Sequence, residues 1–404
     1  MTRVLVVDDS RFMRTVIGNA LTGAGYDVET AANGSEGVER AGTFDPDVVT
    51  MDVEMPEMDG IDAVERIMAT NPTAILMLSV HTERGAEATL DALERGAVDF
   101  LHKPDGSGSR NIAHLTDEVI EKVDDLAEAD VSSVALARAA ASAYATGAGR
   151  AENPGQTTVT GNAVAGGSSD VQSSVDRGTA GPDVSPGLGS DAEHDESAPI
   201  AVDGERADAP TVVIGASTGG PKIVERLFGR LPADLEAKVL VVQHMPPGFT
   251  ERLAERLDDR SAYDVTEATD RQRLEPGEVA VAPGDYHLEV TSNVGDSLRL
   301  RLDDGERIHG VRPAIDMTMQ SAAERVSDAL CGVVLTGMGR DGAAGIEAIK
   351  EAGGQTIAQD EATSPVFGIP CQAIETGCVD TIAPADGVAD AIVDAFTTDG
   401  ENDD

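Results

Sequence analysis

The chain has 404 residues, enough for two domains with substantial hydrophobic cores. Its formal net charge of −43 excludes a general nucleic-acid-binding surface, which would be basic. Only five of its 30 basic residues are lysine. This acid excess favours a halophilic cytosol, where the Debye length falls to about 3 Å or less, over an ordinary acidic protein. The three cysteines predict reduced thiols, and no apolar run or leader pattern predicts a membrane span or secretion, so we expect a cytoplasmic protein.

The first part of the chain alternates strand-like apolar runs with helical stretches. The strand-like runs are residues 3–7, 27–30, 48–51, 74–78 and 99–101. Continuous apolar runs are typical of parallel strands buried on both faces, and five β/α alternations predict a doubly wound parallel sheet. Ligands of such sheets bind at the carboxyl ends of the strands.

Polar residues of a particular kind follow these strands: Asp8, Asp9, Asp52, Ser79 and Lys103. One acidic residue at a strand end is usually a helix cap, but suitable residues at four strand ends favour a shared site. Converging carboxylates repel one another unless a cation lies among them, and hard oxygen ligands in a shallow, open site suit Mg²⁺. A lysine opposite them could neutralise a transferred phosphoryl group, and a serine hydroxyl could hydrogen-bond to its oxygen.

These residues resemble the signature of response-regulator receiver domains. The resemblance spans the whole first domain and includes Asp8-Asp9, the segment DVEMPEMDG at 52–60, Ser79 and Lys103-Pro104. It implies that Asp52 accepts a phosphoryl group. The Mg²⁺ ligands that it implies are the carboxylates of Asp8, Asp9 and Asp52 and the backbone carbonyl of Glu54.

The same resemblance implies roles for three further side chains. Ser79 and Phe100 occupy the positions of the phosphorylation switch, and Lys103 contacts the phosphoryl group. The Lys103–Pro104 peptide bond is expected to be cis, as in the family, because proline makes this isomer accessible.

A change of composition marks the connection between the domains. Residues 114–144 have a helical pattern, and residues 147–208 are rich in Gly, Ser, Ala, Asp, Thr and Pro, with almost no large apolar groups. Such a segment cannot offset its ordering entropy, so we expect a flexible tether with a mean span of about 40–50 Å, an inert spacer being the alternative. The expected domains are a receiver at 1–127, a helical extension and acidic linker at 128–208, a catalytic domain at 209–397 and an acidic tail at 398–404.

The second domain repeats the alternation. Strand-like runs lie at 211–214, 239–243, 279–282, 298–302, 332–335, 356–358 and 380–383. Helical patterns lie at 222–231, 249–257, 313–326, 343–351 and 387–396. The expected fold class is therefore α/β, with two doubly wound, mostly parallel-sheet domains: a flavodoxin-like receiver and a Rossmann-like second domain.

A glycine-rich turn follows the first strand of this domain. Residues 215–219 fit the pattern G-x-S-x-G, a sharp turn that exposes a serine hydroxyl above the sheet, although phosphate-binding turns are also rich in glycine. His244 ends the next strand and Asp341 follows a third, so Ser217, His244 and Asp341 could act as nucleophile, base and orienting acid. Two backbone N–H groups could form an oxyanion hole: those of Thr218 and Met338.

Spacing alone leaves other assignments open. His287 and His309 are rival bases, and the rival acids are Asp285, Asp316 and Asp360. His244 could be a structural histidine and Asp341 only a helix cap. The chain order Ser, His, Asp disfavours the α/β-hydrolases, in which the acid precedes the histidine.

Five segments of this domain resemble the chemotaxis protein-glutamate methylesterases, the CheB family: 215–220, 243–250, 282–288, 312–316 and 335–343. The resemblance covers essentially the whole domain, and a receiver joined to an esterase is that family's architecture. It implies that Ser217 is the nucleophile, His244 the base and Asp341 the orienting acid, with oxyanion donors at Thr218 and Met338. The chain departs from the family in its longer connector and in Ala314, where a hydroxyl residue is expected.

The resemblance implies a phosphorylation-activated serine hydrolase that demethylates glutamate γ-methyl esters, and deamidates glutamines, on the cytoplasmic helices of chemoreceptors. Its unphosphorylated receiver would lie over the Ser217 rim. The implied partners are methyl-accepting chemoreceptors and a chemotaxis histidine kinase, with no nucleic acid, no membrane insertion and no cofactor for the esterase reaction. The alternatives are a second domain that binds a ligand or partner without catalysis, and a DNA-binding output, for which the sequence offers no basic recognition helix.

Overall fold

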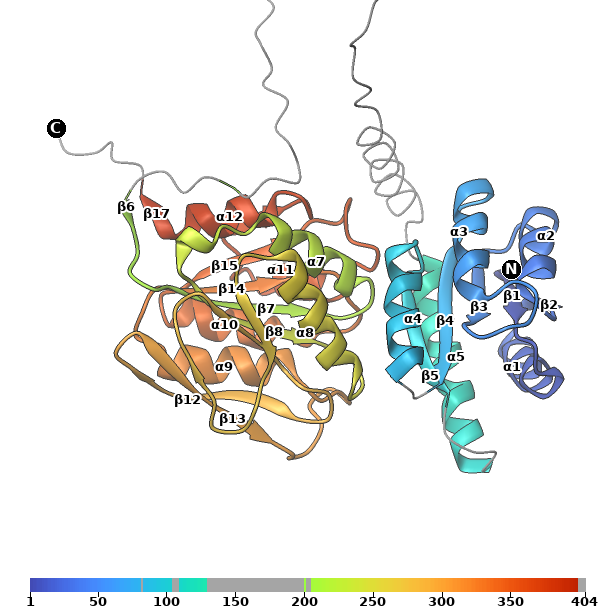
Figure 1. Ribbon diagram of the computed structural model, residues 1–404, viewed down its shortest axis with the longest axis horizontal. Helices are drawn as coiled ribbons and strands as arrows, with labels where there is room; N and C mark the ends of the chain where they lie inside the picture. Colours follow the sequence, from blue (N-terminus) through green and yellow to red (C-terminus); the bar gives the residue numbers. More distant parts are fainter. Residues whose placement is uncertain (81–82, 104–108, 129–199, 201–204, 399–404) are drawn as a thin grey trace, which may run out of the picture. The chain divides into compact units, whose positions relative to one another are not determined.

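The computed structural model describes residues 1–80, 83–103, 109–128, 200 and 205–398. The expected helical extension past residue 128, most of the linker and tail, and the Lys103–Pro104 bond lie outside these residues. Among the described helices, none combines the length and apolar character needed to cross a membrane. Figure 1 colours the elements along the chain.

The first domain is a parallel sheet with the strand order β2-β1-β3-β4-β5. Its strands are β1 (Arg3–Val7), β2 (Asp27–Ala31), β3 (Val48–Asp52), β4 (Ala74–Val80) and β5 (Asp99–Lys103). Its helices are α1 (Arg11–Ala24), α2 (Gly34–Phe44), α3 (Gly60–Thr70), α4 (Glu83–Glu94) and α5 (Ser109–Glu128). The doubly wound parallel sheet predicted from the sequence is confirmed.

Burial on both faces explains the continuous apolar run of β1. Leu5 and Val7 belong to the core cluster on the side of α2, α3 and α4, whereas Val4 and Val6 belong to the cluster on the side of α1 and α5. A strand buried in this way needs apolar residues at every position, and polar residues begin only where it ends, at Asp8. The sheet therefore concentrates its polar groups at one edge.

The second domain contains a parallel sheet with the strand order β16-β15-β14-β7-β8-β11-β9. The strands are β7 (Thr211–Ala216), β8 (Lys238–Gln243), β9 (Asp264–Glu267), β11 (Glu278–Val281), β14 (Leu330–Val334), β15 (Gln355–Gln359) and β16 (Thr381–Ala383). The helices are α7 (Gly220–Arg230), η1 (Ala233–Leu235), α8 (Phe249–Arg260), α9 (Ile315–Arg325), α10 (Ala343–Glu351), α11 (Ile369–Glu375) and α12 (Val388–Phe396). The mostly parallel α/β class predicted for this domain is confirmed.

An antiparallel sheet supplements this core. It joins β10 (Arg273–Leu274), β13 (Ser297–Asp303) and β12 (His287–Val294), and a short pair joins β6 (Glu205–Arg206) to β17 (Thr397–Thr398). The strand-like run at 298–302 belongs to this antiparallel sheet, which explains its alternation of leucine and arginine, because only one face of the strand is buried.

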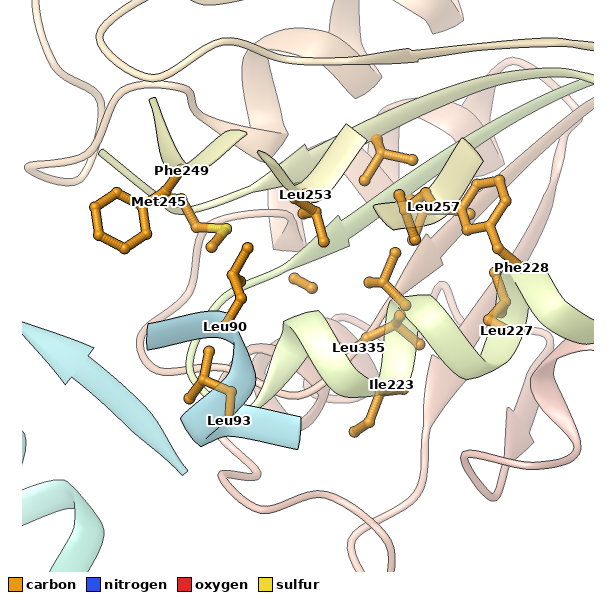
Figure 2. Packing of buried hydrophobic residues seen from close by; sticks show 14 of the residues in the cluster. Leu90, Leu93, Ile223, Leu227, Phe228, Met245, Phe249, Leu253, Leu257 and Leu335 are labelled. Carbon is orange, nitrogen blue, oxygen red and sulfur yellow. The ribbon is translucent and has the colours of Figure 1, made fainter. Parts of the chain in front are cut away.

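Apolar residues of α4 share a core cluster with the second domain. Leu90 and Leu93 belong to the same buried cluster as Ile223 of α7 and Phe249 of α8, and Figure 2 shows these side chains together. Burying one leucine stabilises a contact by about 1.5–3 kcal/mol relative to exposure. Helix α4 of the receiver therefore contributes apolar side chains to a core cluster that also contains residues of the second domain.

Charged groups surround this apolar contact. The guanidinium of Arg256 on α8 bonds Asp91 Oδ1 at 2.9 Å and Glu94 Oε2 at 2.6 Å, both on α4. Its Nε also bonds the buried carboxylate of Glu225 at 2.9 Å, within the second domain. Arg256 thus forms ion pairs with the receiver and also neutralises the buried Glu225 of the second domain.

Candidate active site and phosphorylation site

The turn after β7 presents Ser217 at the carboxyl edge of the sheet. All six residues of β7 are buried, and the chain reverses into α7 through Gly219, whose φ of 77° is in the left-handed region that favours glycine. The Ser217 N–H donates to the Thr336 carbonyl at 3.0 Å, and the Ser217 carbonyl accepts from Gly220 N at 2.8 Å and Gln243 Nε2 at 2.8 Å. These bonds fix the serine backbone on both sides.

His244 follows β8, the neighbouring strand. Its N–H donates to the Ala216 carbonyl at 3.0 Å, so its backbone lies beside the residue that precedes Ser217. Its ring Nε2 lies 2.8 Å from Asp341 Oδ2, and the exposed fractions of the two side chains are 11% and 3%. Because an ionised carboxylate only accepts hydrogen bonds, Nε2 carries the proton, and Nδ1 is left as the basic nitrogen.

Asp341 remains ionised in this setting. Burial by itself would raise the pKa of its carboxyl, but the hydrogen bond and charge of His244 and the N–H groups of Asp316 and Ile315 hold that pKa below its usual value. An ionised Asp341 can fix the tautomer of His244 and can stabilise an imidazolium formed when the ring accepts a proton.

Ser217 and His244 are neighbours without a direct bond. No hydrogen bond joins the Ser217 hydroxyl to the His244 ring within the described part of the chain. Their strands are paired in register, with Ala216 opposite Gln243. Bonds between a nucleophile and its base are often long before substrate binds. The structure therefore places the two side chains at adjoining strand ends without a bond between them.

The loop after β14 closes over the Ser217 turn. A Cβ at Gly337 would lie 2.6 Å from Ser217 Cβ, so only glycine fits this approach. Among the described residues, none accepts a hydrogen bond from the main-chain N–H of Thr218 or Met338. Thr218 follows Ser217 directly, and Met338 follows Gly337, which packs against Ser217. Main-chain donors of this kind near a nucleophilic serine are what an oxyanion hole requires.

The rival bases have other partners. His287 is buried; its Nδ1 accepts from Ala314 N–H at 3.2 Å and its Nε2 lies 2.9 Å from the Glu306 carbonyl, so neither nitrogen is available. His309 Nε2 lies 3.0 Å from Asp316. The rival acids Asp285 and Asp360 bond Arg307 and the Thr363 backbone, respectively.

The strand ends of the receiver bring the predicted carboxylates together. One ligand oxygen from each of Asp8, Asp9 and Asp52 lies within 4.8 Å of the others, a donor set that fits Mg²⁺. Lys103 Nζ bonds Asp8 at 2.8 Å and Asp52 at 2.6 Å. Burial raises the pKa of Asp52 to about 6; Lys103 opposes this shift, and Asp8 and Asp9 add to it. Glu54 lies exposed just after this strand end.

The predicted switch residues are buried. Ser79 donates its hydroxyl to the Gly85 carbonyl at 3.2 Å, in the first turn of α4. Phe100 stacks on Phe249, the first residue of α8, with ring centroids 4.6 Å apart. The receiver residue expected to move on phosphorylation thus contacts the helix that follows His244.

Sequence reasoning missed a polar contact at Thr218. Its hydroxyl donates to Asp99 Oδ2 at 2.7 Å and accepts from Lys122 Nζ at 2.8 Å, and Lys122 also bonds Asp99. Asp99 begins β5 and Lys122 lies on α5, so both partners belong to the receiver. No signal in the sequence links residues 119 positions apart.

Both domains match known protein families. Residues 4–110 match the response regulator receiver domain and residues 212–392 match the CheB methylesterase. A protein-glutamate methylesterase/protein-glutamine glutaminase of Halobacterium salinarum is 47% identical over 98% of this chain and 99% of its own length, and one of Pyrococcus horikoshii is 40% identical over 97% and 93%. The crystal structure of the Thermotoga maritima CheB methylesterase catalytic domain matches with 42% identity over 46% of this chain and 98% of its own, at a TM-score of 0.45.

The molecule is thus a response regulator whose output domain is of the methylesterase class. The extent and identity of the full-length matches assign it further: the chain belongs to the protein-glutamate methylesterase/protein-glutamine glutaminase family, the CheB methylesterases.

Proposed function

We propose that this protein is a phosphorylation-activated serine hydrolase that demethylates glutamate γ-methyl esters on the cytoplasmic helices of chemoreceptors and deamidates glutamines there. The observation that carries the proposal is the His244–Asp341 bond at the rim that holds Ser217, because it leaves a basic ring nitrogen for a serine proton. Family membership supplies the class of substrate.

In the proposed reaction, Ser217 Oγ attacks the ester carbonyl while His244 Nδ1 takes the hydroxyl proton. The N–H groups of Thr218 and Met338 stabilise the oxyanion of the tetrahedral intermediate. Collapse breaks the ester C–O bond, and the imidazolium returns its proton to the leaving methoxide, which departs as methanol. His244 then deprotonates a water molecule, which attacks the acyl-serine carbonyl. The bond from the acyl carbon to Ser217 Oγ breaks, the imidazolium returns its proton to Oγ, and the glutamate product leaves. With a glutamine substrate, the leaving group is ammonia.

The receiver supplies the control. A histidine kinase is the proposed phosphodonor, and Asp8, Asp9, Asp52 and the carbonyl of Glu54 would hold a Mg²⁺ ion. The ion supplies positive charge for the incoming phosphoryl group. Lys103 then contacts the phosphoryl oxygens, as its present bond to Asp52 permits.

The contacts at Thr218 and Phe249 support an inhibited unphosphorylated state. Asp99 and Lys122 hold the side chain of a proposed oxyanion residue, and Phe100 stacks beside the helix that follows His244. A shift of Ser79 and Phe100 on phosphorylation would loosen these contacts and admit the receptor helix. The acidic chain suits a cytoplasmic protein that inserts into no membrane and binds no nucleic acid.

Methanol release from methylated receptor membranes tests the proposal. We expect release by the wild-type protein, stimulated by a small phosphodonor with Mg²⁺, and a loss on the order of 10⁴-fold or more in Ser217→Ala. Asp52→Asn is the matched control for stimulation, since it keeps the shape of the side chain but accepts no phosphoryl group. Equal release by wild-type and S217A protein would refute the hydrolase, and equal stimulation of D52N would refute the control through Asp52.

A further inference from the structure

Asp316, one of the rival acids, lies beside the proposed triad. It is the second residue of α9, it is 4% exposed, and one of its carboxylate oxygens lies within 4.8 Å of Asp341 and His309 ligand atoms. Two buried carboxylates so close together repel each other unless donors surround both. The hydrogen-bond donors around Asp316 indicate the structural role of its carboxylate.

The two acids cap each other's helices. Helix α9 follows Ala314, which has no capping side chain, and Asp341 takes its place: Oδ2 accepts from Ile315 N at 2.7 Å and Oδ1 from Asp316 N at 2.9 Å. Helix α10 follows Gly342, which likewise has no side chain to cap it. There, Asp316 Oδ1 accepts from Gly342 N at 2.9 Å and from Gly345 N at 2.7 Å. Asp341 therefore caps α9, the helix that contains Asp316, and Asp316 caps α10, the helix that begins just after Asp341.

His309 completes the coordination of Asp316. Arg340 Nε donates to His309 Nδ1 at 3.5 Å, which leaves the ring proton on Nε2, and Nε2 donates to Asp316 Oδ2 at 3.0 Å. His309 thus supplies Asp316 with a third hydrogen-bond donor, beside Gly342 N and Gly345 N. Burial and then the charge of Asp341 raise the pKa of Asp316 above its usual value, whereas the pKa of Asp341 stays low.

We propose that Asp316 is a positioning residue of the esterase reaction: by holding the Gly342 and Gly345 N–H groups it fixes the loop of Asp341, and through Asp341 the tautomer and orientation of the His244 ring. This inference rests on the proposed function. Asp341 receives its backbone bonds from α9, and the loop that carries Asp341 is tied to the same helix by Asp316. These reciprocal hydrogen bonds restrict the position of the Asp341 carboxylate to the narrow range that the reaction permits.

The test compares Asp316→Ala, which removes the acceptor, with Asp316→Asn, which keeps Oδ1 as an acceptor for Gly342 and Gly345. On methylated receptor membranes, we expect D316A to lower kcat by about 10- to 100-fold with KM changed less than twofold. D316N should stay within about threefold of wild type. Asp380→Ala is the matched control, since Asp380 accepts from the Thr356 backbone at 3.0 Å in the same domain and should affect stability alone.

A spectroscopic measurement separates this claim from the esterase proposal. Nitrogen-15 NMR of the His244 ring should report a single tautomer with the proton on Nε2 in wild-type and D316N protein, and a mixture in D316A. If the wild-type protein releases no methanol, the esterase proposal is refuted. The NMR comparison of the His244 tautomer in wild-type and D316A protein still tests whether Asp316 positions this ring. D316A with wild-type kcat and a single tautomer overturns the inference, as does D316N that loses as much as D316A. Should D316A not fold, Asp316→Ser, which keeps one acceptor, takes its place in both measurements.

Discussion

The fit of the Gly337 loop against Ser217 gives a quantitative test of the active-site geometry. In Gly337→Ala, the new Cβ would lie 2.6 Å from Ser217 Cβ, 3.0 Å from Ser217 N and 2.6 Å from Ile369 Cδ1. The isoleucine methyl can rotate away, but the Ser217 backbone is held by Thr336 and by the end of β7. Overpacking of this kind costs about 1–3 kcal/mol of folding free energy. A displacement of about 1 Å at a reacting group costs about 100-fold in rate. We therefore expect G337A to fold and to lose about 100-fold in kcat.

The assay is methanol release under single-turnover and steady-state conditions, together with thermal unfolding. Gly332→Ala is the matched control, because its Cβ would meet the Ile349 Cδ1 atom at the same distance of 2.6 Å, on β14 itself and away from Ser217. It should lose similar stability and keep kcat within about twofold of wild type. A G337A enzyme with wild-type kcat would refute the reasoning, and so would equal losses of kcat in both variants.

Two further predictions concern the receiver. Because the pKa of Asp52 is raised to about 6, its stabilising contribution is complete below the unfolded pKa and lost as pH rises through 6. D52N should therefore exceed wild type by up to about 3 kcal/mol at pH 7.5 in EDTA, measured by urea unfolding, with no excess near pH 4; an excess independent of pH would contradict this. Asp91→Asn/Glu94→Gln removes three half-exposed ion pairs, those of Arg256 with Asp91 and Glu94 and that of Arg260 with Glu94. Since each contributes about 0.2–1 kcal/mol, unphosphorylated methanol release should rise by about 3- to 160-fold. Arg256 keeps Glu225, so phosphorylated activity should not change, and an unaltered basal rate would refute a role of these pairs in inhibition.

Strands buried on both faces made most of the fold predictable. Runs such as Val239–Gln243 contain β-branched and apolar residues and end at a polar residue, so both the sheet and its functional edge follow from the sequence. Strand β9 (Asp-Val-Thr-Glu) buries only one of its four residues fully and carries no such signal. Helix α11 begins with a proline in its first turn and is only seven residues long, too short for a clear period.

Site residues that directly follow a predicted strand could be identified from the sequence. Site residues defined by contacts between distant parts of the fold could not. Ser217 and His244 end neighbouring strands, so topology alone brings their backbones together. The bond from Thr218 to Asp99 joins two domains, and no local pattern encodes it. Asp316 was visible only as a rival acid, because reciprocal capping of two helices requires their packing to be known.

The two domains neutralise carboxylates at their strand ends in different ways. In the receiver, Asp8 and Asp52 share one lysine ammonium, and burial still raises the pKa of Asp52, so another cation is favourable there. In the second domain, Asp341 faces the N-terminus of α9, which carries a partial positive charge of about half a unit. A side-chain cation can be exchanged, whereas main-chain donors remain in place as long as the helix does. The receiver thus gains charge on phosphorylation, whereas His244 and the main-chain donors of α9 together hold the Asp341 carboxylate in its ionised form. We therefore expect phosphorylation to act on access to Ser217 and on the Thr218 contact rather than on the charge of Asp341.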